Sequence, residues 1–207
     1  MANENTHLYL ASIIRKRLPK RQRDIIDKNP NLYYLGAMAP DILLYSRKFR
    51  PLEKRLQSRA VIKDLAKNCR KEDLPFLYGY ITHIETDEVF HKAIPKDTYE
   101  HLYAETSVDK HLGLKKPMSE YFHPEIPQPF VKTAKIPGKT FLRILKRQMW
   151  LNKIFLRSGF WYHFAPRVVK PMFHKYVKIL KLPKDVDKLL KKSVENSVRE
   201  IKKCAQN

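Results

Sequence analysis

The chain has 207 residues, with 42 Lys and Arg against 21 Asp and Glu, which gives a formal net charge of +21 at pH 7. Its 43% hydrophobic content is enough for a folded core and excludes wholesale disorder. Five glycines without a G-x-G-x-x-G or P-loop pattern exclude Gly-rich phosphate loops, and two cysteines exclude a disulfide framework.

Apolar residues recur at helical spacing along nearly the whole chain, and this pattern predicts an all-α fold, a multi-helix bundle. Thr6 and Asp73 are expected to be helix N-caps, and Pro40 is expected to end a helix near residue 38. Five prolines between residues 114 and 139 predict a long irregular connection. The expected helices cover 7–18, 22–27, 32–38, 52–70, 74–91, 98–112, 140–157, 166–180 and 185–203.

The positive charge is concentrated in the second half of the chain. Residues 1–110 contain 20 Lys and Arg against 15 Asp and Glu, whereas residues 111–207 contain 22 against 6. We expect one domain over 1–207, with a basic helical part over 113–207. Glu4 stands where a signal peptide would be basic, and no apolar run is long enough to span a membrane. Together with the few cysteines, these features predict a cytoplasmic protein.

Two neighbouring segments carry metal-ligating residues at matching spacing. His83, Asp87 and His91 lie at positions i, i+4 and i+8, and so do His101, Glu105 and Asp109. On a helix, such residues differ in direction by only about 40° and 80°, so each triple forms one stripe. Two helices joined by a short loop pack antiparallel, which can bring the stripes together. The pattern predicts a metal centre between helices.

Other polar residues of the first half leave two interpretations open. His7 lies on the apolar face of the first helix, where a buried core histidine is the alternative to a ligand. Asp41 lies in an apolar stretch, where an unpaired buried carboxylate would be costly, and a helix-capping role is its alternative. Glu85 and Glu88 lie off the stripe of His83 and are expected on the surface.

The spacing of these motifs resembles the zinc-dependent phospholipase C family over about residues 5–112. The resemblance rests on Thr6-His7, Gly36–Asp41 (GAMAPD), Gly79–His91 (GYITHIETDEVFH) and His101–Asp109. It implies a mostly helical hydrolase of phosphoric esters whose substrate is a phospholipid or another phosphodiester. The zinc ligands that it implies are His7, Asp41, His83, Asp87, His91, His101 and Glu105, with Asp109 as a further ligand or the partner of one.

The resemblance also implies how many ions are bound and what two residues do. Met1 lies six residues ahead of His7, and no histidine lies between Asp41 and His83, so we expect two zinc ions, with three as the alternative. Asp87 is the candidate to bridge two ions, and Asp41 the candidate to bridge them or to accept the proton of the attacking water.

The basic second half suggests an anionic partner but does not identify it. Residues 148–164, which include Trp150, could face an anionic membrane or stack on nucleic-acid bases, although a buried helix is the more common outcome for such a segment. The Lys-rich terminal helix is expected to be a solvated face. A non-catalytic helical module that holds a metal for stability, and binds an anionic partner through this half, is the alternative to a hydrolase.

Overall fold

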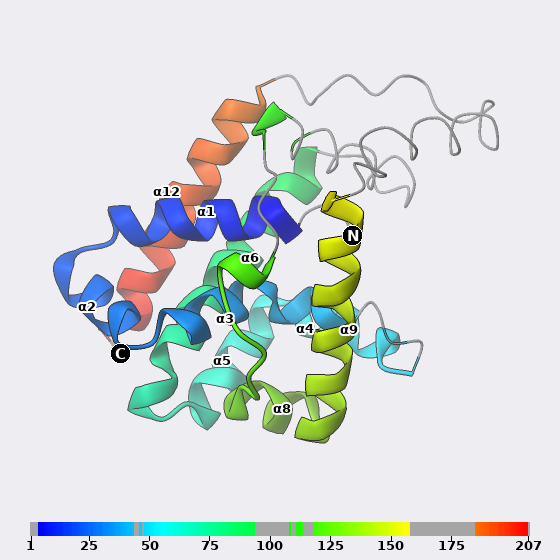
Figure 1. Cartoon of the computed structure of the whole chain (residues 1–207). Helices are drawn as coiled ribbons and strands as arrows, with labels where there is room; N and C mark the ends of the chain where they lie inside the picture. The colour runs from blue at the N-terminus through cyan, green and yellow to red at the C-terminus, as the bar shows by residue number, and fades with distance from the viewer. Residues whose placement is uncertain are drawn as a thin grey trace.

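The computed structural model describes residues 4–43, 46, 48–93, 108, 111–113, 118–157 and 185–206 (Figure 1). Every regular element in these ranges is helical, which confirms the all-α prediction. Three short 3₁₀ turns cover Arg50–Leu52, Lys71–Asp73 and Met118–Glu120. The α-helices are α1 (Glu4–Arg17), α2 (Lys20–Lys28), α3 (Pro30–Ile42), α4 (Glu53–Leu56), α5 (Arg59–Asn68), α6 (Leu74–Ala93), α8 (Gln128–Ala134), α9 (Gly138–Arg157) and α12 (Val186–Cys204).

Helix α6 is the centre of the bundle. Every residue from Pro75 to Asp87 is buried, so this helix is enclosed on all sides rather than amphipathic. Helices α1, α2, α3, α5 and α12 all pack against it, and α8 connects α5 with α9. Figure 1 shows α12 and α9 on opposite sides of this core, with α1 crossing it. Because α12 contacts both α1 and α6, the C-terminal helix belongs to the same packed unit as the N-terminal ones.

Two glycines allow α3 and α6 to approach each other at backbone distance. A Cβ atom on Gly79 would overlap the carbonyl oxygen of Tyr33 and lie 2.9 Å from the amide nitrogen of Ala37. A Cβ atom on Gly36 would overlap the carbonyl oxygen of Phe76. The two glycines therefore set the spacing between the helices that carry Asp41 and His83.

Buried tyrosines connect this helix pair to its neighbours. The Tyr33 hydroxyl donates a hydrogen bond to the carbonyl oxygen of Ala11 in α1, over 2.9 Å. The Tyr80 hydroxyl donates to the carbonyl oxygen of Leu56 at the end of α4. Each bond satisfies a buried polar group and orients one helix against another.

The structure corrects two expected ends in the first three helices. Thr6 is not an N-cap, because α1 begins at Glu4 and includes it. Pro40 does not end its helix, since α3 continues through it to Ile42. Proline lacks only the N–H that would bond to Gly36, and the helix stops two residues later, so the loss falls in its last turn. Asp41 consequently lies within α3.

Three further expectations in the middle of the chain are also corrected. The helix expected over 52–70 is broken at Gln57 and Ser58 into α4 and α5. Asp73 lies in a 3₁₀ turn, where its carboxylate accepts the backbone N–H of Arg70. The proline-rich stretch contains α8, which the sequence did not predict. Pro127 is its N-cap and Pro129 lies in its first turn, where a missing N–H costs nothing.

The terminal helix agrees with the sequence pattern. Val186, Leu190, Val194 and Ile201 are buried along one stripe of α12. The helix expected over 166–180 and almost all of that expected over 98–112 lie outside the described residues. Within the described ranges, no helix combines the length and apolar composition that crossing a bilayer requires.

Candidate metal centre

Three helices bring four metal-ligating side chains together: His7 from α1, Asp41 from α3, and His83 and Asp87 from α6. The Nε2 atom of His83 lies 3.0 Å from Oδ2 of Asp87 and 3.6 Å from Oδ1 of Asp41. The Nε2 atom of His7 lies 3.2 Å from Oδ1 of Asp87 and 3.9 Å from Oδ2 of Asp41. Each imidazole therefore faces both carboxylates.

The backbone of α3 fixes the ring of His83. Its Nδ1 lies 2.8 Å from the carbonyl oxygen of Ala37, so Nδ1 carries the proton and donates it. Nε2 is buried and has no aligned hydrogen-bond partner among the described residues, although Asp87 is close. With Nδ1 held by this bond, Nε2 of the neutral imidazole would be free to ligate a metal placed between it and the two carboxylates.

The imidazoles of His7 and His83 are stacked, with ring centroids 4.0 Å apart and planes 18° from parallel. Both rings are completely enclosed, with 1% and 0% of His7 and His83 exposed. Stacking keeps the two Nε2 atoms on the same side, toward Asp41 and Asp87. The rings cannot turn to solvent without disrupting the contact between α1 and α6.

Two carboxylates beside two buried imidazoles require a compensating cation. Burial alone lowers the pKa of His83, but the Asp87 and Asp41 carboxylates outweigh it and raise that pKa to about 9. Burial tends to raise the pKa of Asp87, but the His83 and His7 imidazoles hold it well below its usual range. In the absence of a metal, a proton on the His83 imidazole supplies positive charge, and a divalent cation would replace it.

The donor set fits zinc. Histidine nitrogen and carboxylate oxygen are both zinc ligands, and four of them in a tetrahedron at about 2.0–2.2 Å from the ion lie about 3.3–3.6 Å from one another. The observed nitrogen-to-oxygen separations of 3.0–3.9 Å are of this order, and they involve both oxygens of each carboxylate. One ligand atom from each of His7, Asp41 and His83 can be chosen so that all lie within 4.8 Å of one another.

One edge of the cluster reaches solvent. The Asp41 side chain is 14% exposed, and Nε2 of Gln57 donates a 3.0 Å hydrogen bond to its Oδ1. His91, one turn beyond Asp87, is 43% exposed, and its Nε2 lies 3.9 Å from Oδ1 of Asp87. The cluster is therefore accessible to solvent on the side of Asp41 and His91.

The structure thus assembles part of the residue set that the sequence singled out. His7, Asp41, His83 and Asp87 lie together, and His91 lies at their exposed edge. The second triple of His101, Glu105 and Asp109 lies outside the described residues. His7 is buried, but it faces carboxylates rather than apolar side chains alone. Asp41 lies in the last turn of α3 and so does not cap a helix N-terminus.

Glu85 differs from its expected surface position. It is 1% exposed, and Nη2 of Arg59 in α5 lies 2.8 Å from its Oε2. Nε of Arg59 lies 2.6 Å from Oε2 of Glu88, so one guanidinium contacts two carboxylates of α6. Sequence reasoning missed Arg59, and it missed Gln57 as the partner of Asp41. Neither has a local signal, since both pairings arise from packing between helices.

A protein-family model described as zinc-dependent phospholipase C matches residues 6–154, which is more than two thirds of the chain. The matched region contains His7, Asp41, His83 and Asp87, and it extends beyond residue 112 through α8 and most of α9. Comparison with curated proteins and with solved structures gave no match.

Proposed function

Since this chain belongs to the zinc-dependent phospholipase C family, we propose that it hydrolyses the phosphodiester bond of a phospholipid at the centre formed by His7, Asp41, His83 and Asp87. The observation that carries the proposal is the buried Nε2 of His83, which lies 3.0 Å from Asp87 and 3.6 Å from Asp41 while the bond from Nδ1 to Ala37 fixes the ring.

The four residues would hold a first zinc ion, with the imidazoles as neutral ligands and the carboxylates supplying the charge. Zinc, when bound, lowers the pKa of a coordinated water to about 7 and so supplies a nucleophile at neutral pH. Asp87 is the proposed bridge to a second ion, because its Oδ1 also lies 3.9 Å from Nε2 of His91. His101, Glu105 and Asp109 are the proposed remaining ligands of that ion.

Asp41 is the proposed acceptor of the proton from the attacking water. Its carboxylate reaches solvent more than that of Asp87 does, with 14% against 9% of the side chain exposed. Gln57 holds Oδ1 by a hydrogen bond, which fixes the direction of the group and leaves Oδ2 as the proton acceptor.

Hydrolysis of a purified phospholipid tests this proposal. We expect the zinc-loaded protein to release diacylglycerol and the phosphorylated head group, the products of cleavage on the glycerol side of the phosphate. Removing zinc with a chelator should abolish release, and adding zinc back should restore it. Retention of zinc without hydrolysis of any phospholipid or soluble phosphodiester would contradict the proposal and favour a non-catalytic helical module.

A further inference from the structure

Helix α9 has one face on which exposed cations surround an exposed tryptophan. Trp150 is 61% exposed and is the large hydrophobic side chain left in solvent within the described part of the chain. We call this the α9 outer face; its exposed residues are Lys139, Arg143, Lys146, Trp150 and Lys153. Because these residues follow one another at steps of four and three, they lie within about 80° of one another around the helix and along about 21 Å of its length.

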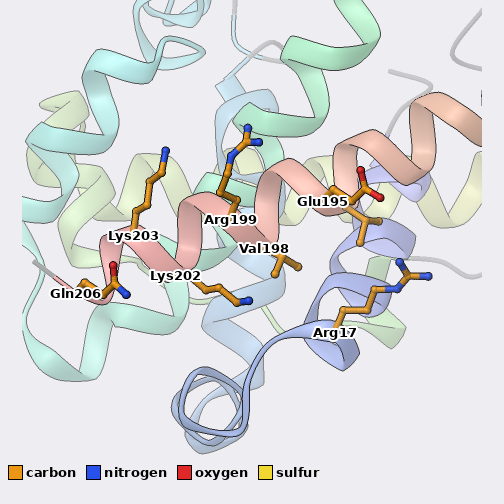
Figure 2. A pocket seen from close by; sticks show the side chains of 8 residues that line it. Arg17, Glu195, Val198, Arg199, Lys202, Lys203 and Gln206 are labelled. Atoms are coloured by element: carbon orange, nitrogen blue, oxygen red, sulfur yellow. The ribbon is translucent and has the colours of Figure 1, made fainter.

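Among the residues that the structure describes, no acid forms an ion pair with a cation of the α9 outer face. The sequence of α9 itself contains no Asp or Glu. The basic end of α12 differs, because Glu200 lies 2.9 Å from Lys203 and 3.5 Å from Arg199. Glu195 also lines the pocket between α12 and Arg17 of α1 (Figure 2).

The opposite face of α9 anchors the helix to the body of the protein. Phe141 and Leu145 are fully buried, and Met149 is 9% exposed. The ring of Phe141 lies 5.4 Å from that of Phe130 in α8, which in turn contacts the rings of Phe76 and Tyr80 in α6. Helix α9 also packs against α3, which carries Asp41. The α9 outer face therefore has a fixed direction relative to the candidate metal centre.

We propose that the α9 outer face docks the protein onto the surface of an anionic phospholipid bilayer. This inference rests on the proposed function, which places a phospholipid at the centre of His7, Asp41, His83 and Asp87. Lysines and arginines close to an anionic membrane each add to binding, and tryptophan favours the depth of the head groups. A single ring does not supply the succession of stacking surfaces that single-stranded nucleic acids use. The chemistry of this face therefore favours lipid.

Vesicle binding by the zinc-loaded full chain tests the docking surface. We expect it to bind vesicles of phosphatidylcholine with phosphatidylglycerol, and to bind much less to phosphatidylcholine alone. The double variant Lys139→Glu/Lys146→Glu should lower the partition coefficient at least about tenfold. Trp150→Ala should lower it by about tenfold through lost apolar burial. In a Trp161→Phe background, Trp150 fluorescence should shift to shorter wavelength when anionic vesicles are added.

The matched control is Lys191→Glu/Lys202→Glu, which makes the same change of charge on one face of α12. It should leave vesicle binding within about twofold of wild type. An equal loss in the control would overturn the proposal, because binding would then follow net charge alone. Equal binding to both vesicle types, or tighter binding to a single-stranded oligonucleotide that Lys139→Glu/Lys146→Glu removes, would also overturn it.

A soluble phosphodiester separates this inference from the proposed function. We expect Lys139→Glu/Lys146→Glu to retain zinc and to hydrolyse the soluble substrate as wild type does, while losing rate on anionic vesicles. A wild-type protein that binds anionic vesicles through α9 but hydrolyses nothing supports docking and contradicts the hydrolase. If wild-type protein hydrolyses the soluble substrate but does not bind anionic vesicles, the docking proposal is contradicted and the proposed hydrolase function is not.

Discussion

Asp87→Asn is expected to lower zinc affinity at least about 100-fold and to reduce phospholipid hydrolysis to background. The Asp87 carboxylate lies close to the imidazoles of His7, His83 and His91, so its negative charge acts on all three. An amide of nearly the same shape keeps the packing but removes the negative charge and half of the acceptor capacity. Zinc titration against a competing chelator measures the loss, together with product release from phospholipid.

Glu88→Gln is the control for this substitution. Glu88 is the next residue of α6 and also a carboxylate, but it points away from the cluster and contacts Arg59 and Lys92. We expect the zinc affinity and the rate of phospholipid hydrolysis of the Glu88→Gln variant to stay within about twofold of wild type. If Glu88→Gln lowered zinc affinity and hydrolysis as much as Asp87→Asn does, or if Asp87→Asn kept its zinc, the assignment of Asp87 as a zinc ligand would be wrong.

Gly79→Ala is expected to lower the free energy of unfolding by about 3 kcal/mol, toward the upper end of overpacking effects. The added methyl group would overlap the backbone carbonyl of Tyr33, and a backbone atom cannot move aside as a side chain can. Helices α3 and α6 would have to separate, and Asp41 would move away from His83. The variant should therefore also bind zinc more weakly, as denaturant unfolding and zinc titration can show.

Gly138→Ala tests whether this effect belongs to the helix contact. The three atoms nearest to a Cβ atom on Gly138 all belong to the side chain of Ile126, the first at 2.9 Å, and that side chain can shift. We expect a change in stability below about 1 kcal/mol and unchanged zinc affinity. Equal stability of the two alanine variants would contradict a backbone contact between α3 and α6 at Gly79.

The helices that could be predicted are those whose pattern does not depend on tertiary contacts. The apolar stripe of α12 is a local property, and its burial is confirmed. Local rules failed where packing outweighed them, as at Pro40, where a buried helix continues through a proline. Helix α8 was missed because its prolines lie at the start of a short helix, where they do not oppose it.

The sequence predicted which site residues share one helix, but not which residues of different helices come together. Spacing places His83 and Asp87 on one stripe of a helix, and the structure has them side by side. The burial of Glu85 was not predictable, because the covering residue, Arg59, comes from another helix. Local sequence left both His7 and Asp41 undecided between two interpretations; only the packing of α1 and α3 against α6 brings them to His83.

The cations behind the net charge of +21 lie on surfaces that differ in whether acids accompany them. On α12, acids lie among the lysines and arginines and pair with some of them. On α9, the described cations have no such partners and surround an exposed tryptophan. Total charge alone does not distinguish these surfaces, whereas the proposed vesicle experiment does.

The most direct test of the zinc centre is X-ray absorption at the zinc edge of the loaded protein, with the metal content measured on the same sample. We expect at least one zinc per chain and a first shell of nitrogen and oxygen alone, at about 2.0–2.1 Å, with the outer scattering of imidazole. Cys69 and Cys204 line a pocket between α5, α6 and α12 that none of the four site residues lines, so their sulfur atoms should not contribute to the first shell. A sulfur shell at about 2.3 Å, or a zinc content well below one per chain, would contradict a centre built from His7, Asp41, His83 and Asp87.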